Sequence, residues 1–228
     1  MKQNKKIGII GGLGANASSF FLQILINKIN QNSIKMPEII LDSVSIDDFI
    51  SDESKIKNGQ KELSKVVEKF NLLKPDIVVM CCNTAHIIYP KINQKANYNF
   101  PSLINLVKNK IIDSQVKNIG ILATPNTLKH QLYQNISKKI FLPNLNLQNI
   151  LEKNIRLVIN SDFEKINYDL ISQKINKFIK QNNLDGIVLG CTEIPVFFSK
   201  IKLDKDITIF NSSEILANHL ISFLNVKI

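Results

Sequence analysis

The chain carries one strand-and-cysteine pattern in each of its halves, and this repeat constrains the fold more than any other feature. Residues 76–86 read DIVVMCCNTAH, and residues 185–195 read DGIVLGCTEIP. In both segments an apolar run ends at a cysteine that small polar residues follow. Such an apolar run is typical of a parallel strand that is buried on both faces. The two cysteines, Cys82 and Cys191, lie 109 residues apart (191 − 82).

A second landmark precedes each cysteine strand. Residues 6–12 read KIGIIGG and residues 118–124 read NIGILAT, so that a short strand runs into a loop of small residues in both halves. Two halves of like fold commonly pack about a pseudo-twofold axis. Because ligands of open α/β sheets gather at the carboxyl ends of the strands, we expect Cys82 and Cys191 to face each other across one cleft.

Strands and helices alternate along the chain, which predicts an α/β fold with two pseudo-symmetric Rossmann-like halves, parallel sheets and a cleft between them. We expect residues 1–103 together with 212–228 to form the N-terminal half, and residues 104–211 to form the C-terminal half. The predicted strands are 6–10, 38–45, 76–80, 101–104, 119–123, 186–190 and 207–210. The predicted helices follow the glycine loop at 11–14, cover 58–73, begin near 84, run from 124–127 toward 138, and cover 163–181 and 212–224; the type of 142–148 is left open.

Composition narrows the class of protein. The chain has 228 residues and is 44% hydrophobic, which is enough for a substantial core. Its net charge is +10, but Arg156 is the only arginine and the lysines are scattered, so we predict no nucleic-acid partner. No apolar segment approaches the length of a membrane span. The first residues have too short an apolar run for a signal peptide, so we expect a cytoplasmic protein without a membrane partner.

The cysteine count predicts neither disulfides nor a metal. Cys81 and Cys82 are adjacent, which suits a structural disulfide poorly, and the third cysteine leaves an odd number. Without a CxxC or His/Cys cluster, we predict no metal site. Cys81 is expected to be a small buried hydrophobic residue.

Two other classes of protein remain open at this point. Gly12, Gly14 and Ala17 fit the GxGxxA pattern of dinucleotide-binding proteins, and Asp42 ends the next strand, which would suit an NAD-dependent oxidoreductase. Two α/β lobes also describe non-catalytic proteins that bind small molecules. Neither class explains the two matched cysteines. The glycines can equally let backbone N–H groups approach a small carboxylate.

Two thiols on opposite sides of a small molecule suit stereochemical inversion by two bases. One group removes a weakly acidic α-proton while the other returns a proton to the opposite face. A cysteine at a strand end beside a helix N-terminus is expected to form its thiolate more easily. Asn83 and Thr84 on one wall and Thr192 on the other can donate hydrogen bonds to the α-carboxylate, where charge develops in the transition state.

The motifs GGLG near the start, CNTAH at 82–86, GILAT before the second loop and GCTEIP at 190–195 resemble the aspartate/glutamate racemase superfamily. They are most similar to cofactor-independent aspartate racemases, and the similarity includes the FNSSEILA segment near the end. A decarboxylase of the same superfamily resembles the chain at only one of its two cysteines.

The resemblance implies a racemase of aspartate that needs no pyridoxal phosphate or other cofactor and forms a homodimer. It implies Cys82 and Cys191 as the catalytic acid/base pair. The substrate contacts it implies are Gly11, Gly12, Asn83, Thr84, Thr124 and Thr192.

The chain departs from the family pattern in two places. Relatives selective for aspartate have an arginine for the distal carboxylate just after the second strand, where this chain has SIDDF at 45–49. A family lysine ahead of the long helix of the second half is replaced by Val158-Ile159. A broad-specificity amino-acid racemase is therefore the alternative function.

Four further polar residues lie in or near these motifs. His86 is expected to orient or pack the loop after Cys82 rather than to transfer protons. Glu193 could bond to the loop, steer the amino group or serve structure alone. His130 and Tyr133 are predicted to lie on the surface or at an interface.

Overall fold

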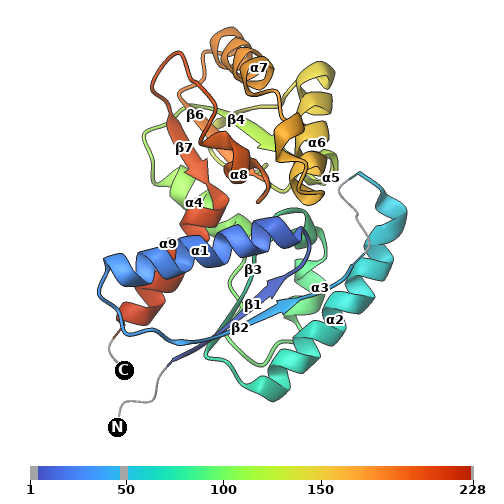
Figure 1. The fold of residues 1–228 in the computed structure, drawn as a ribbon, viewed down its shortest axis with the longest axis vertical. Helices are drawn as coiled ribbons and strands as arrows, with labels where there is room; N and C mark the ends of the chain where they lie inside the picture. Colours follow the sequence, from blue (N-terminus) through green and yellow to red (C-terminus); the bar gives the residue numbers. More distant parts are fainter. Residues whose placement is uncertain (1–4, 47–50, 227–228) are drawn as a thin grey trace.

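The computed structural model describes residues 5–46 and 51–226, and it contains two parallel sheets (Figure 1). The first has the strand order β2-β1-β3, and the second has the order β5-β4-β6-β7. The three strands of the first sheet and the first three of the second follow the same plan. In each, the earliest strand lies in the centre, the next strand pairs on one side and the cysteine strand pairs on the other. The predicted α/β fold with two similar halves is confirmed.

Strands and helices alternate from residue 6 to residue 112. In chain order they are β1 (Lys6–Gly11), α1 (Ala15–Gln31), β2 (Glu38–Ser43), η1 (Glu53–Lys55), α2 (Ile56–Leu73), β3 (Ile77–Met80), η2 (Thr84–Ile87), α3 (Tyr89–Asn93) and α4 (Leu103–Ile112).

The elements from residue 118 onward begin with the equivalent central strand. They are β4 (Asn118–Ala123), α5 (Pro125–Lys129), β5 (Lys139–Phe141), α6 (Leu145–Ile159), η3 (Phe163–Lys165), α7 (Tyr168–Gln181), β6 (Gly186–Gly190), α8 (Ile194–Phe198), β7 (Thr208–Asn211) and α9 (Ser212–Asn225).

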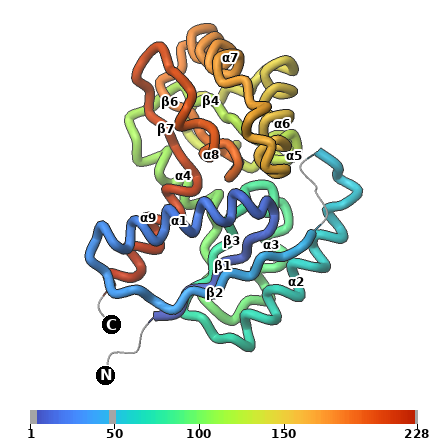
Figure 2. The backbone as a smooth tube through the Cα atoms, in the orientation of Figure 1, coloured from blue at the N-terminus to red at the C-terminus, as the bar shows by residue number. Residues whose placement is uncertain are grey.

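Helix α9 lies beside α1 of the first half, although it follows the last strand of the second sheet (Figures 1 and 2). One apolar cluster accordingly combines Phe21 of α1 with Leu216 and Leu220 of α9, and it continues to Ile121 of β4. The proposed domain boundaries at residues 103 and 212 remain a prediction.

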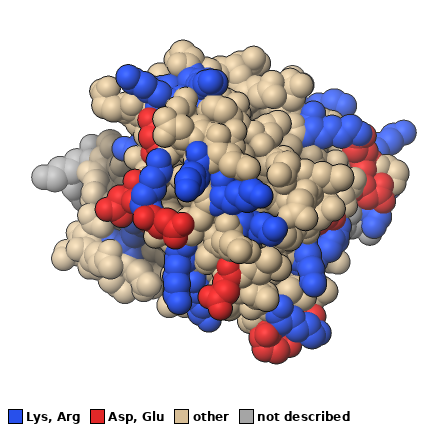
Figure 3. All heavy atoms as spheres, turned by 90° about the horizontal axis from the view of Figure 1, so that it is seen from above, with Lys and Arg blue, Asp and Glu red and all other residues tan. Residues whose placement is uncertain are grey.

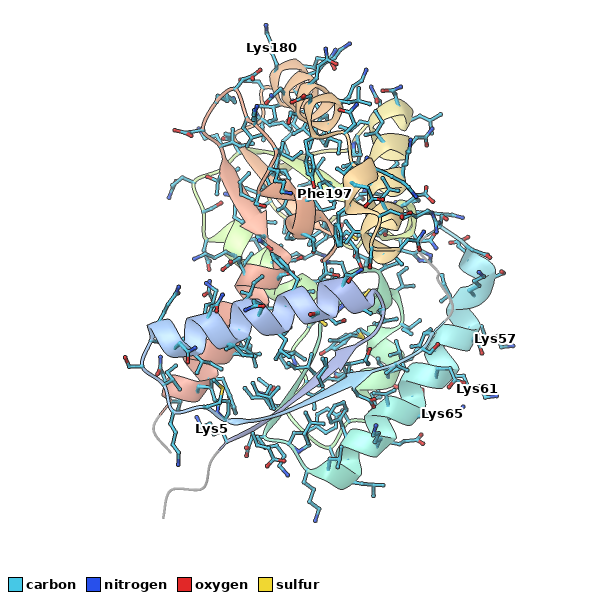
Figure 4. All side chains as sticks on the ribbon, viewed as in Figure 1. Lys5, Lys57, Lys61, Lys65, Lys180 and Phe197 are labelled. Atoms are coloured by element: carbon cyan, nitrogen blue, oxygen red, sulfur yellow. The ribbon has the colours of Figure 1, made fainter. Side chains whose placement is uncertain are left out.

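Charged side chains lie on the outer faces of the helices, and apolar side chains lie on the inner faces, as in other amphipathic helices. Lys57, Lys61 and Lys65 project outward along α2, whereas Phe197 points into the interior of the second half (Figure 4). On the face that Figure 3 shows, lysines are spread between acidic and uncharged residues. In the described part of the chain no helix is long and apolar enough to cross a membrane.

Three expectations about local structure are wrong. Residues 101–104 do not form a strand, because Ser102 accepts a hydrogen bond from the N–H of Asn105 at 3.3 Å and begins α4. The helix expected to run toward residue 138 already ends at Lys129, and turns lead from it to β5. The helix expected at 163–181 is divided into η3 and α7, with extended backbone at Ile166 between them.

Candidate active site

Cys82 and Cys191 lie at the carboxyl ends of equivalent strands, as the repeat predicts. Cys82 follows the last residue of β3 by two positions, and Cys191 directly follows β6. Their exposed fractions are 7% and 3%. A negative charge on Cys82 raises the pKa of Cys191, so the two thiols are close enough to interact. Cys81 packs in a different apolar cluster from Cys82, which agrees with the alternation of side chains along a strand.

Burial dominates the acidity of the thiols. It raises the pKa of Cys82 and Cys191 well above the ordinary value of 9.0, and it raises the pKa of Cys81 to about 11. Backbone hydrogen bonds from Thr84 and Ala85 lower the pKa of Cys82, but by less than burial raises it. The N–H groups after Cys82 thus favour its thiolate as expected, but burial opposes this effect and outweighs it.

Glu193 lies between the Cys191 loop and the glycine loop of the first half. Its Oε2 atom accepts a hydrogen bond from Sγ of Cys191 at 2.9 Å and one from Oγ1 of Thr192 at 3.3 Å. A Cβ atom at Gly14 would stand 1.8 Å from Oε1 of Glu193. Gly14 has a φ of +124°, so this position requires glycine for both its conformation and its space. The buried Glu193 carboxylate raises the pKa of both Cys82 and Cys191.

Asn83 is held by a buried chain of hydrogen bonds. Its Nδ2 atom donates to Oγ of Ser212 at 3.0 Å, and the Ser212 hydroxyl donates to the carbonyl of Leu189 at 2.8 Å. The phenol of Tyr133 donates to Oδ1 of Asn83. Asn83 is 1% exposed and Ser212 is 0% exposed, so this series of hydrogen bonds crosses the interior between the two cysteine loops.

Three threonine hydroxyls from the two halves form a closed cluster. Oγ1 of Thr84 lies 2.9 Å from that of Thr124 and 3.2 Å from that of Thr127, and the last two are 2.8 Å apart. Thr124 also caps α5, because its hydroxyl accepts a hydrogen bond from the N–H of Thr127 at 3.2 Å. These hydroxyls satisfy one another. Each can rotate to donate to an oxyanion placed beside them.

The glycine loop is fixed by Ser18 and by the residues after β2. The Ser18 hydroxyl accepts a hydrogen bond from the N–H of Gly12 at 2.9 Å and donates to the carbonyl of Gly14 at 3.1 Å. Gly12 has a φ of +83°, and a Cβ there would lie 2.3 Å from the backbone of Val44. Gly11 ends β1, and its carbonyl accepts a hydrogen bond from the N–H of Val44 at 3.1 Å. The structure thus places Gly11 and Gly12 at the carboxyl end of β1, beside the end of β3 that leads to Cys82.

His86 orients the loop after Cys82, as predicted. Its Nδ1 atom is 2.8 Å from the carbonyl of Cys82, and its Nε2 accepts a hydrogen bond from the N–H of Leu103 at 3.0 Å. Its ring stacks on Tyr89 with the centroids 5.1 Å apart. Burial lowers the pKa of His86 to about 4, so the ring is neutral at pH 7. Both ring nitrogens are used in structural contacts.

The segments that depart from the family pattern are only partly described. Residues 47–50, which include most of the segment without the family arginine, lie outside the described residues. The carbonyl of Val158, near the expected lysine position, accepts a hydrogen bond from Nδ2 of Asn16 at 2.6 Å. Within residues 5–46 and 51–226, no group of three or more His, Cys, Asp or Glu side chains could hold a metal ion.

Sequence reasoning missed several residues of this site. Tyr133 is predicted to lie at the surface or an interface, but it is 3% exposed and contacts Asn83 inside the protein, so that prediction is wrong. Ser212 is predicted only as the first residue of a helix. Thr127 follows Thr124 by three residues, a spacing that brings two side chains together at the start of a helix and could have identified it.

Comparisons with known proteins identify the family of the chain. The family model described as Asp/Glu/Hydantoin racemase matches residues 10–220. A glutamate racemase of Aliarcobacter butzleri is 29% identical over 78% of this chain and 74% of its own length. One from Aliivibrio fischeri is 32% identical over 72% of this chain, but over only 61% of its own length.

Solved structures share the fold over nearly the whole chain. An aspartate racemase homologue from Pyrococcus horikoshii has a TM-score of 0.80 at 24% identity and covers 97% of this chain and 100% of its own. The Picrophilus torridus aspartate racemase has a TM-score of 0.72 at 26% identity, with 98% and 96% covered. A Francisella tularensis glutamate racemase in complex with D-glutamate has a TM-score of 0.72 at 17% identity, with 97% and 81% covered.

Proposed function

The chain belongs to the Asp/Glu/Hydantoin racemase family, and we propose that it interconverts L- and D-aspartate without a cofactor, using Cys82 and Cys191 as its acid/base pair. One observation carries the proposal. The two thiols stand at the carboxyl ends of equivalent strands, are buried, and lie within electrostatic reach of each other. Two acid/base groups of the same kind suit a reaction whose forward and reverse directions are mirror images.

The proposed reaction transfers two protons. One cysteine thiolate removes the α-proton from one face of the substrate, and the electron pair of the broken C–H bond delocalises into the α-carboxylate. The other cysteine, as a thiol, then gives its proton to the opposite face of the α-carbon. The cysteines have exchanged protonation states at the end, so the opposite enantiomer is handled by the reverse sequence.

The substrate itself can help to form the thiolate. Burial and the Glu193 carboxylate both raise the pKa of the thiols. The ammonium group of an amino acid brings a positive charge, which acts in the opposite direction. Glu193 can also accept the proton of Cys191, since its Oε2 atom is already the hydrogen-bond acceptor of that thiol at 2.9 Å.

The hydroxyl cluster and Asn83 can receive the carboxylates. Thr84, Thr124 and Thr127 are bonded to one another, and rotating their hydroxyl hydrogens toward a carboxylate replaces weak neutral bonds with charge-assisted ones. Such donors matter most for the α-carboxylate, because negative charge accumulates there as the α-proton leaves. Thr192 supplies a further hydroxyl beside Cys191.

We propose aspartate rather than glutamate as the substrate because the length of this chain matches the aspartate racemase structures better. The chain spans nearly all of the two aspartate racemase-type structures, but it spans a smaller share of the glutamate racemases. Glutamate is the second candidate, because the curated relatives bear that name.

A panel of single L- and D-amino acids, followed by circular dichroism and chiral chromatography, tests the proposal. We expect dialysed protein to racemise aspartate fastest. Turnover of glutamate alone would replace the proposed substrate, and racemisation of many amino acids at similar rates would support broad specificity. No racemisation of any amino acid would overturn the function.

A further inference from the structure

Tyr133 connects the two loops that carry the cysteines. It lies in the turn that follows α5 and is 3% exposed. Its phenol donates a hydrogen bond to Asn83, the residue after Cys82. Its ring packs against Gly190, the residue before Cys191, where a Cβ atom would stand only 2.8 Å from Cε2 of the ring. One side chain therefore contacts both walls of the proposed site.

The hydrogen bonds of Tyr133 and Ser212 fix the orientation of the Asn83 amide. The Ser212 hydroxyl has a single hydrogen, which it donates to the carbonyl of Leu189 at 2.8 Å, so its oxygen accepts from Nδ2 of Asn83 at 3.0 Å. The carbonyl of the amide then faces the phenol of Tyr133. A flipped amide would place its oxygen against a hydroxyl whose hydrogen is already used. The second Nδ2 hydrogen of Asn83 remains for a substrate carboxylate.

We propose that Tyr133 is a positioning residue for racemisation, which holds the Asn83 amide in one orientation and sets the spacing of the Cys82 and Cys191 loops. This inference rests on the proposed function, because it assigns Tyr133 a task in that reaction. Proton transfer is sensitive to small displacements, and a shift of about 1 Å can cost about 10²-fold in rate. A residue that contacts the neighbours of both acid/base groups controls such a displacement.

The contacts of Tyr133 differ from those of an ordinary buried tyrosine in this chain. The phenol of Tyr98 also has an internal partner, but that partner is the backbone carbonyl of Val67 at 3.4 Å. Tyr133 instead bonds to the side chain that follows Cys82. Burial, followed by the charge of Cys191, raises the pKa of Tyr133, so its phenol stays protonated and remains a donor at neutral pH.

The test compares Tyr133→Phe with Tyr98→Phe, since each change removes one internal phenol. We expect both to lower the thermal midpoint modestly. Only Tyr133→Phe should reduce kcat for aspartate, by about 10- to 100-fold, with a smaller change in KM. An unchanged kcat in a folded Tyr133→Phe protein overturns the proposal. Should that variant fail to fold, Ser212→Ala removes the other contact of the amide, and the same fall in kcat is expected.

A double variant separates positioning from general packing. If Tyr133 acts through Asn83, Tyr133→Phe should slow an Asn83→Ala protein by no more than about twofold, because coupled residues are not additive. Full multiplication of the two single losses would mean that Tyr133 works independently of Asn83, and this part of the proposal would be wrong.

Thiol alkylation makes the inference testable even if the proposed function fails. Iodoacetamide labelling of the three cysteines, followed by peptide mass spectrometry, needs no substrate. We expect Tyr133→Phe to change the labelling rates of Cys82 and Cys191 by about threefold or more relative to Cys81, since loosened loops open more often. If wild-type protein racemises nothing but this change occurs, the function fails while the positioning contact stands. Unchanged relative labelling overturns the positioning role.

Discussion

Sγ of Cys191 donates a hydrogen bond to Oε2 of Glu193 over 2.9 Å, and both side chains are at most 3% exposed. A thiol bonded to a buried carboxylate keeps its proton more firmly, because the thiolate would lie beside a second negative charge. The same carboxylate is also an acceptor to which that proton can move. The identity of residue 193 therefore bears directly on the acid/base state of the site.

Glu193→Gln should increase the reactivity of Cys191. The change removes the negative charge and keeps a hydrogen-bond acceptor, so the pKa of Cys191 falls and more thiolate is present at a given pH. We expect alkylation of Cys191 at pH 8 to become about 3- to 10-fold faster. Time courses of iodoacetamide labelling measure this. Glu68→Gln, an exposed change in α2, is the control and should have no effect, whereas slower labelling of Cys191 in Glu193→Gln would contradict the prediction.

Cys82→Ser and Cys191→Ser should each abolish racemisation. A serine hydroxyl is far too weakly acidic to take part in proton exchange at neutral pH, so we expect racemisation to fall by more than about 10³-fold. Cys81→Ser is a control that changes a neighbouring thiol in a different apolar cluster. It should racemise nearly normally.

The same two variants test whether the thiols act on opposite faces. Each should still exchange the α-proton of one enantiomer with deuterium from heavy water, with retained configuration, and the two should favour opposite enantiomers. Exchange needs only the first proton transfer, whereas inversion needs both. Should both variants exchange the same enantiomer, the cysteines act on one face and the two-base mechanism is wrong.

His86 should make the protein less stable in mild acid. Burial lowers its pKa in the folded state from 6.5 to about 4. Between these values the unfolded chain binds the proton and the folded chain does not, so the free energy of unfolding falls as the pH falls from 6.5 to 4. A shift of this size corresponds to about 3 kcal/mol.

Urea unfolding between pH 4 and pH 7 measures the contribution of His86. The control is His86→Gln, which keeps a donor and an acceptor but does not titrate in this range. We expect the stability difference between wild type and this variant to shrink below pH 6.5. A difference that is constant across the range would show that His86 does not titrate as its buried position requires.

The parts of the structure that local patterns determine could be predicted from the sequence. The strands that precede Cys82 and Cys191 are continuous apolar runs, and each begins and ends within one residue of its predicted bounds. Helix α6 could also have been found, because Leu147, Leu151, Ile155 and Val158 repeat at helical spacing and are all buried. The prediction of a strand at 101–104 is wrong because the apolar residues there belong to the buried face of a helix, which consists of Leu103, Ile104, Val107 and Ile111.

The missing parts of the site depend on contacts between distant segments. Tyr133 is buried because the second half places it against Gly190 and Asn83, and nothing in its own neighbourhood indicates this. The pKa values of the thiols also depend on contacts between distant segments. Strand ends and helix dipoles can be inferred from sequence, whereas the depth of burial and the effect of Glu193 on the distant Cys82 follow from the packing of the two halves.

Thr124 offers the sharpest test of the hydroxyl cluster, because two substitutions separate its hydroxyl from its shape. Thr124→Val keeps the branched shape and removes the hydroxyl that contacts Thr84 and Thr127 and caps α5. We expect a loss of about 1 kcal/mol in stability from the cap. A fall of about 10- to 100-fold in kcat/KM should accompany it, from the lost donor to the substrate carboxylate.

Thr124→Ser removes only the methyl group, so it should retain most of the activity and the cap. Steady-state kinetics and thermal unfolding of both variants provide the comparison. If the hydroxyl serves only α5, Thr124→Val will lose stability while kcat/KM stays near the wild-type value, and the cluster is not the carboxylate site. If Thr124→Ser loses as much activity as Thr124→Val, the loss cannot be assigned to the hydroxyl alone, which would equally contradict the proposed role.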